Sequence, residues 1–176
     1  RRDPEYVGRA KEIQKAQKAI EAGECPAEAV PELKPVMEAV KKQFADISKE
    51  NVGVGSTIFA VKPGDGSARE QAASCQKVLG GWANIANEYA TKRYRSNLIN
   101  WGMLPFLIPQ GELPFTNGDF LFFPHIREAV ADKADSITGY VVKEDGLKEF
   151  QVTLGELTDD EREIILKGCL INYNRK

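Results

Sequence analysis

The chain has 176 residues, of which 42% are apolar and 28% charged; this is close to the average for globular proteins and long enough to bury a core. The formal net charge is −2 and no basic cluster stands out, so nucleic acid is a poor candidate partner, because contacting phosphates requires a positive surface. No apolar run approaches the roughly 18 residues that a membrane-spanning helix needs, so we expect no membrane partner.

The three cysteines, Cys25, Cys75 and Cys169, are widely spaced. They show neither a C-x-x-C metal spacing nor a disulfide framework, which favours a reducing, cytoplasmic location and no metal on this chain. The sequence begins at Arg1 rather than methionine, and we expect it to be a piece of a longer polypeptide.

Helical periodicity predicts a first helix over residues 4–22 and a second over about 35–47, joined by a connector that three prolines interrupt. We interpret residues 1–50 as an N-terminal helical segment without chemistry of its own. Residues 51–176 form the rest of what we expect to be one compact domain.

Residues 56–61 are β-branched and aromatic and predict a buried strand. A helix over 68–79 follows, with Ala72, Cys75 and Leu79 expected to face the sheet, and residues 82–86 predict a second strand. A strand–helix–strand unit of this length gives parallel strands with a right-handed connection.

A helix over 92–101 carries Lys92, Arg93 and Arg95, which more often form a solvated face than a phosphate site. His125, the only histidine, is interpreted as a structural or surface residue before a short helix over 126–131. The other predicted elements are strands over 106–108, 119–123, 136–142 and 148–154, the last two joined by a hairpin turn at 144–146, and a final helix from the capping box at Thr158 to about residue 170.

The loop over 62–73, Lys-Pro-Gly-Asp-Gly-Ser-Ala-Arg-Glu-Gln-Ala-Ala, lies between the first strand and its helix. The first amides of a helix have no partner within it and the helix dipole places positive charge there, so this order of elements can form an anion site. The Ser67 hydroxyl and the Arg69 guanidinium are placed to join those amides around a carboxylate. The structural alternative is a capping serine followed by a solvent-facing arginine.

This loop and a second motif resemble the C-terminal swivel domain of the aconitase family. The family patterns are G-x-G-S-S-R-E-H-A-A and, about twenty residues later, N-L…G-[LIM]-L-P; this chain has Gly-Asp-Gly-Ser-Ala-Arg-Glu-Gln-Ala-Ala over 64–73, then Asn97-Leu98 and Gly102-Met103-Leu104-Pro105. The resemblance covers roughly residues 50–170. It implies an α/β fold, the layered β/β/α swivelling domain, here with an extra N-terminal helical segment.

The resemblance also implies an activity. Aconitase-type enzymes are hydro-lyases that move a hydroxyl between adjacent carbons of a tricarboxylate such as citrate or isocitrate through an alkene. Ser67 matches the family's base, Arg69 matches the arginine that binds a substrate carboxylate, and Gly66 and Ala68 belong to the same substrate-binding turn. A serine needs positive charge and hydrogen-bond donors to favour its anionic form, and the helix amides and Arg69 would supply both.

Three departures from the family pattern place the identity of the substrate in doubt. Ala68 replaces the second serine of the turn, and Gln71 replaces the usual histidine. The segment 89–97 is about one residue longer than its family counterpart and matches it weakly, so no site residue is carried over from it.

The family's 4Fe-4S cluster is held by three cysteines on other domains, and the resemblance therefore implies those cluster-bearing domains as partners and no cluster on this chain. An arginine that the family places near the start of this domain also has no counterpart. We expect the isolated chain to be catalytically silent, and hydration of aconitate by the purified chain alone would contradict this.

Two other functions stay open: the small subunit of an isopropylmalate-isomerase-like dehydratase, and a non-catalytic domain in which Ser67 and Arg69 only hold an anion. Cluster cysteines encoded upstream of this chain would argue against the first. The effect of Ser67→Ala on turnover tests the second.

Overall fold

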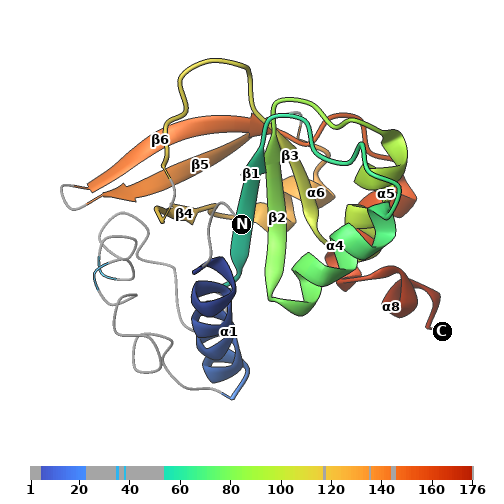
Figure 1. Ribbon diagram of the computed structural model, residues 1–176, viewed down its shortest axis with the longest axis horizontal. Coiled ribbons are helices and arrows are strands. Elements are labelled where there is room, and N and C mark those ends of the chain that lie inside the picture. The colour runs from blue at the N-terminus through green and yellow to red at the C-terminus, as the bar shows by residue number, and fades with distance from the viewer. Residues whose placement is uncertain are drawn as a thin grey trace.

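The computed structural model describes residues 5–22, 35, 38, 54–116, 118–134, 136–143 and 146–175. Figure 1 shows the elements, which in chain order are α1 (Tyr6–Glu21), β1 (Ser56–Ala60), α4 (Arg69–Val78), β2 (Gly81–Ala86), α5 (Lys92–Asn100), β3 (Leu104–Leu107), β4 (Phe120–Phe122), α6 (Ile126–Ala131), β5 (Ser136–Lys143), β6 (Gly146–Thr153), α7 (Asp159–Lys167) and α8 (Leu170–Asn174). The helix predicted over 35–47 lies almost wholly outside the described residues. No helix in the described ranges is long and apolar enough to cross a membrane.

The six strands form one mixed sheet in the order β1-β2-β3-β6-β5-β4. The first three are parallel, with α4 and α5 as the crossovers, and the pairs β3–β6, β6–β5 and β5–β4 are antiparallel. The predicted α/β class and the parallel pairing of the first two strands are therefore confirmed.

The parallel half of the sheet meets the antiparallel half at one registered pair, Leu107 with Thr153. Beyond this pair the long β5–β6 hairpin extends away from the helices (Figure 1). Because the strand contact between the halves is so short, a hydrophobic core shared by both halves and the layer of helices contribute much of what holds them together.

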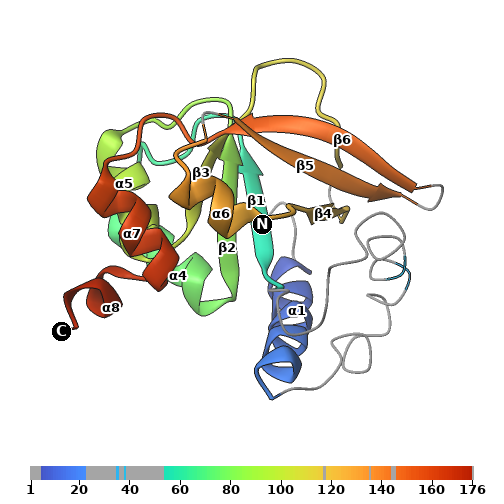
Figure 2. The same cartoon turned by 180° about the vertical axis from the view of Figure 1, so that it is seen from behind.

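A layer of helices flanks the parallel strands. Helix α5 packs against both α4 and α7, and α6 packs against α7; the view from behind in Figure 2 shows α6 and α7 in front. The face that α4 buries differs from the prediction, because Ala73 is fully buried while Ala72 and Cys75 are exposed. Successive residues of a helix point about 100° apart, so an error of one residue changes the face that is predicted to be buried. This helix has no hydrophobic stripe that would mark its buried face in the sequence.

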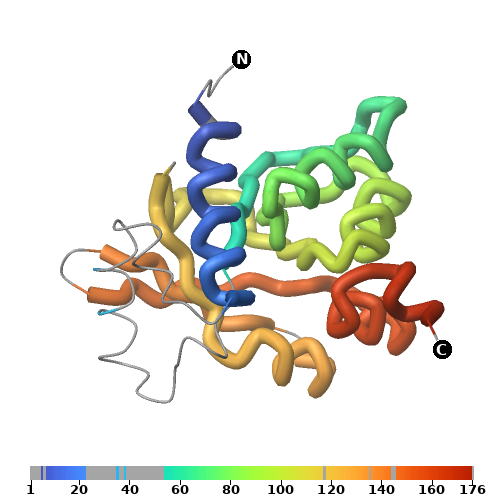
Figure 3. Tube along the Cα trace, turned by 90° about the horizontal axis from the view of Figure 1, so that it is seen from below, coloured from blue at the N-terminus to red at the C-terminus, as the bar shows by residue number. Residues whose placement is uncertain are grey.

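Helix α1 lies apart from that layer, across the lower end of β1, as Figure 3 shows from below. Its inward face consists of small residues, Ala10, Ala16 and Ala19, which allow a close approach. Two glutamines attach it: Gln14 Nε2 donates to the Val78 carbonyl at 2.8 Å, and the amide of Val54 donates to Gln17 Oε1 at 2.8 Å.

The C-terminal helix predicted up to about residue 170 is shorter than expected, and a second helix that was not predicted, α8, follows it. The predicted capping box is present, with Thr158 Oγ1 accepting from the Glu161 amide and Glu161 Oε1 accepting from the Thr158 amide. Helix α7 nevertheless ends at Lys167, because Gly168 adopts a left-handed conformation with φ of 90°, and α8 starts after Cys169.

Candidate anion site at the start of α4

The glycine loop leaves β1 at the carboxyl end of the parallel strands, where α/β proteins place their ligands. The loop after β2 lies beside it. The amide of Glu88 donates to the Val61 carbonyl at 3.1 Å and the amide of Ala90 donates to the Pro63 carbonyl at 2.9 Å. These bonds extend the pairing of the two strands past their ends, so the two loops form one unit.

Ser67, Ala68 and Arg69 line a single open hollow of about 400 Å³ at the N-terminus of α4, together with Glu70 and Gln71. The structure thus brings together three of the four residues predicted for the site. The fourth, Gly66, precedes them in the loop and is exposed, and no atom would lie within 4 Å of a Cβ added to it.

Ser67 is exposed, and its hydroxyl makes no hydrogen bond to any residue that the structure describes. The N-cap of α4 is Ala68, and no side chain caps this helix. The alternative interpretation of Ser67 as a capping serine is therefore wrong. Its hydroxyl and the first amides of α4 are available to a ligand.

Arg69 is half-buried rather than solvent-facing. Its Nε donates a hydrogen bond of 3.2 Å to the carbonyl of Gly64, five residues earlier. Within the described part of the chain its Nη atoms have no hydrogen-bond or ion-pair partner. The guanidinium is therefore held at one edge, and its other nitrogens can bind a carboxylate.

The charge around the hollow is mixed. Arg69 is the cation among its lining residues, and Glu70 in the first turn of α4 is an anion. A carboxylate there stabilises the helix through its dipole and at the same time opposes an anionic ligand. Selection of a ligand with several carboxylates therefore needs cationic groups from outside this hollow.

Two of the three departures from the family pattern, Ala68 and Gln71, lie at the hollow. Ala68 presents a methyl group where the family pattern has a hydroxyl, and Gln71 is exposed at the rim. Because Ala68 is the N-cap of α4, this change also removes a hydroxyl that could cap the helix, whereas Gln71 alters only what the rim of the hollow contacts.

Sequence reasoning missed Thr91 and Gly64. Thr91 Oγ1 accepts from the Tyr94 amide at 3.1 Å as the N-cap of α5, and the same hydroxyl donates to the Gly64 carbonyl at 3.2 Å. A threonine directly before the predicted helix start is a usual capping signal. Its second bond could not be foreseen, because it depends on how two loops lie against each other.

The second family motif lies at the opposite end of the parallel strands, where β3 begins beside the start of β2. Met103 and Pro105 are fully buried there, and Gly102 has φ of +72° with the Gly168 carbonyl against its Cα. This motif therefore serves packing, and it contributes no residue to the hollow.

Among the basic residues of α5, Arg95 has a structural role. Arg95 Nη2 donates to the carbonyls of Leu154 and Glu156 at 2.8 and 2.7 Å, which ties α5 to the segment before α7. Lys92 and Arg93 are exposed, as the interpretation of a solvated face requires.

The described residues do not fit an iron–sulfur cluster. Among them no three His, Cys, Asp or Glu side chains gather where they could hold a metal ion. Cys75 is exposed on α4 and Cys169 lies half-buried after α7.

Comparison with known proteins identifies the family. The sequence model of the aconitase C-terminal domain matches residues 8–111, more than half of the chain, and the chain belongs to this family. The match begins within α1 and ends in the loop after β3. It confirms the resemblance that the two motifs predicted.

Among solved structures, the chain is similar to the crystal structure of 3-isopropylmalate dehydratase from Methanocaldococcus jannaschii. The two are 25% identical, with a TM-score of 0.47, and the similarity covers 82% of this chain and 81% of that one. No curated protein sequence matches the chain significantly.

Proposed function

We propose that this domain supplies the proton-abstracting half of a hydro-lyase site, with Ser67 as the base and Arg69 as the carboxylate-binding residue. The observation that carries the proposal is their shared hollow: a serine hydroxyl without an internal partner lies beside a half-buried arginine at the start of a helix. The proposed substrate is a hydroxy acid with several carboxylates, such as citrate or isocitrate.

The reaction follows from the residues. The Ser67 oxygen, in its anionic form, takes the proton from the carbon next to a substrate carboxylate, and Arg69 holds that carboxylate while negative charge moves onto it. The electron pair forms the carbon–carbon double bond as the neighbouring hydroxyl leaves. Rehydration reverses these steps. Arg69 and the amides of α4 favour the serine anion because both present positive charge to it.

The hollow by itself is too open for this chemistry. Ser67 is exposed to water, so its hydroxyl is not desolvated, and nothing on the described surface assists the departing hydroxyl. We propose that cluster-bearing domains of the same enzyme close over the hollow and complete the site. Exclusion of water would then strengthen the electrostatic effect of Arg69.

The test is Ser67→Ala in the complete enzyme, with aconitate as substrate and formation of the hydroxy acids as the measurement. We expect kcat to fall about 10²–10⁴-fold, the usual contribution of a positioned base. Arg69→Lys should mainly raise KM, because lysine cannot form the two parallel bonds of a guanidinium.

Ser74→Ala is the matched control, because Ser74 lies on the same helix and donates only to the Gln71 carbonyl at 3.2 Å. Turnover of the Ser67 variant near that of the control would overturn the proposal. If citrate binding then depended on Arg69 all the same, the non-catalytic anion-binding function would be supported instead.

A further inference from the structure

The Gly64 carbonyl joins two side chains from different elements. It accepts a hydrogen bond from Arg69 Nε at the start of α4 and another from Thr91 Oγ1 at the start of α5, both at 3.2 Å. A carbonyl oxygen has two lone pairs, so these two donors use its full capacity. The oxygen is thus a fixed point between the two helix starts.

The direction of each bond is determined. Thr91 Oγ1 already accepts from the Tyr94 amide at 3.1 Å, and a hydroxyl has a single hydrogen, which is directed to the Gly64 carbonyl. The Tyr94 amide therefore donates to the Thr91 hydroxyl, and this hydroxyl donates to the Gly64 carbonyl, which also accepts from Arg69 Nε. These three hydrogen bonds connect the N-terminus of α5 to the guanidinium.

The backbone at Gly64 has little freedom to move away from this point. Its φ is +97°, and a Cβ on it would collide with the ring of Tyr94, which is itself buried. The adjacent Pro63 carbonyl accepts from the Ala90 amide at 2.9 Å. The loop thus rests directly on the first turn of α5, and Thr91 sets where its carbonyl points.

We propose that Thr91 is a positioning residue for Arg69. Through the Gly64 carbonyl it holds the Nε edge of the guanidinium and leaves the two Nη atoms for an end-on, two-bond contact with a carboxylate in the hollow. The catalytic part of this inference rests on the proposed function. Its geometric part, the anchoring of Nε, does not.

In the complete enzyme, Thr91→Val should raise KM for aconitate about three- to tenfold, the effect of losing one hydrogen bond, and change kcat little. Thr91→Ser keeps the hydroxyl and should behave as the wild type. Thr158→Val is the matched control. Thr158 also caps a helix, α7, through its hydroxyl, but it makes no contact with Gly64, whereas Thr91 does. Loss of one cap is survivable for a domain of ordinary stability.

A second measurement uses the 176-residue chain and needs no activity. The exchange rates of arginine Nε–H protons with water can be followed by NMR. The Nε–H of Arg69 should exchange more slowly than that of Arg93, which is exposed on α5. Thr91→Val should raise the exchange rate of the Arg69 Nε–H to that of Arg93. Thr158→Val should leave the Arg69 rate below that of Arg93.

The outcomes separate the two proposals. Equal exchange rates for Arg69 and Arg93 in the wild type, or an unchanged Arg69 rate in Thr91→Val, would overturn the positioning role. An unchanged KM in Thr91→Val would overturn it as well, while Ser67→Ala could still abolish turnover. Undiminished turnover in Ser67→Ala would instead contradict the proposed function. The proton exchange rate of Arg69 Nε–H would still test whether Thr91 positions the guanidinium.

Discussion

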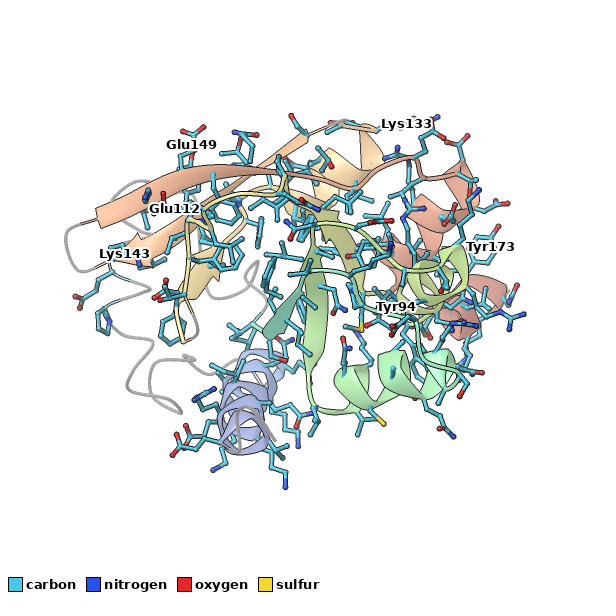
Figure 4. All side chains as sticks on the ribbon, turned by 45° about the horizontal axis from the view of Figure 1, so that its top comes forward. Tyr94, Glu112, Lys133, Lys143, Glu149 and Tyr173 are labelled. Carbon is cyan, nitrogen blue, oxygen red and sulfur yellow. The ribbon has the colours of Figure 1, made fainter. Side chains whose placement is uncertain are left out.

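Tyr94 is the residue on which the candidate site rests. Its side chain is 2% exposed, and its hydroxyl accepts hydrogen bonds from Gln76 Nε2 at 2.9 Å and from Asn84 Nδ2 at 2.8 Å. Figure 4 shows it among the helices beside the parallel strands. One phenol oxygen therefore links α4, β2 and α5, while the Cβ end of the same side chain lies against Gly64.

Tyr94→Phe should lower the free energy of unfolding by about 2 kcal/mol, because it leaves the fully buried Asn84 amide without its partner. Urea unfolding followed by circular dichroism measures the change. Tyr173→Phe is the control, since the Tyr173 hydroxyl donates to Asp160 at the surface and its loss should cost much less. Equal losses in the two variants would show that the buried network contributes little.

The residue scale also shows what the sequence could predict. Ser67 and Arg69 can be proposed for one site because a strand, a glycine turn and a helix start are visible in the sequence and place both residues at the start of α4. Tyr94 and Thr91 cannot, because their partners lie on other elements and no local pattern records such contacts. The error on the buried face of α4 has the same origin: Ala73 is buried by its contact with α5, while its own helix has small or polar residues on every side.

At the scale of elements, a single carboxylate ties the short strand β4 to its neighbour. Asp119 Oδ2 accepts from the Thr116 amide at 2.8 Å, from Thr116 Oγ1 at 3.3 Å and from Lys143 Nζ on β5 at 3.0 Å. The Thr116 amide, and next the Lys143 ammonium, lower the pKa of Asp119 below its usual value near 4. The charged form of this side chain therefore stabilises the fold.

Because the pKa is lower in the folded state, this stabilisation is present at neutral pH and is lost as the pH falls through about 4 and below. Asp119→Asn should reduce the free energy of unfolding by about 1 kcal/mol at pH 7, a modest value because water reaches the ion pair. At pH 3 the difference from the wild type should shrink. Asp65→Asn, an exposed change, is the control, and a pH-independent difference for Asp119→Asn would contradict the assignment.

The order and type of most described elements could be predicted because each has a local cause, but helix α8 was not predicted. β1 is β-branched and aromatic, and Thr158 with Glu161 forms the expected cap of α7. The end of α7 was not predicted, because the helical pattern of the sequence continues past Gly168. Gly168 ends the helix in a left-handed conformation, and its carbonyl lies against Gly102 of a distant segment.

At the scale of the whole molecule, that contact joins the two halves of the fold. The sheet halves share one registered pair, Leu107 with Thr153, so their union depends on the shared hydrophobic core and on the layer of helices. The end of α5, in the parallel half, meets the end of α7, in the antiparallel half, where the backbones of Gly102 and Gly168 touch. A family motif that lies far from the candidate site thus has a purely architectural reason to contain glycine.

Gly102→Ala tests this union. The added methyl would enter the space of the Gly168 carbonyl at a backbone φ of +72°, so strain and overpacking together should lower the free energy of unfolding by about 2–4 kcal/mol. Gly118→Ala is the matched control: its φ is +91°, and no atom lies within 4 Å of the added Cβ, so it reports the backbone strain alone. Urea unfolding of both variants measures the difference. A loss at Gly102 no greater than at Gly118 would mean that the two helix ends can separate without cost. The halves of the sheet would then be held by their shared hydrophobic core and the strand pair.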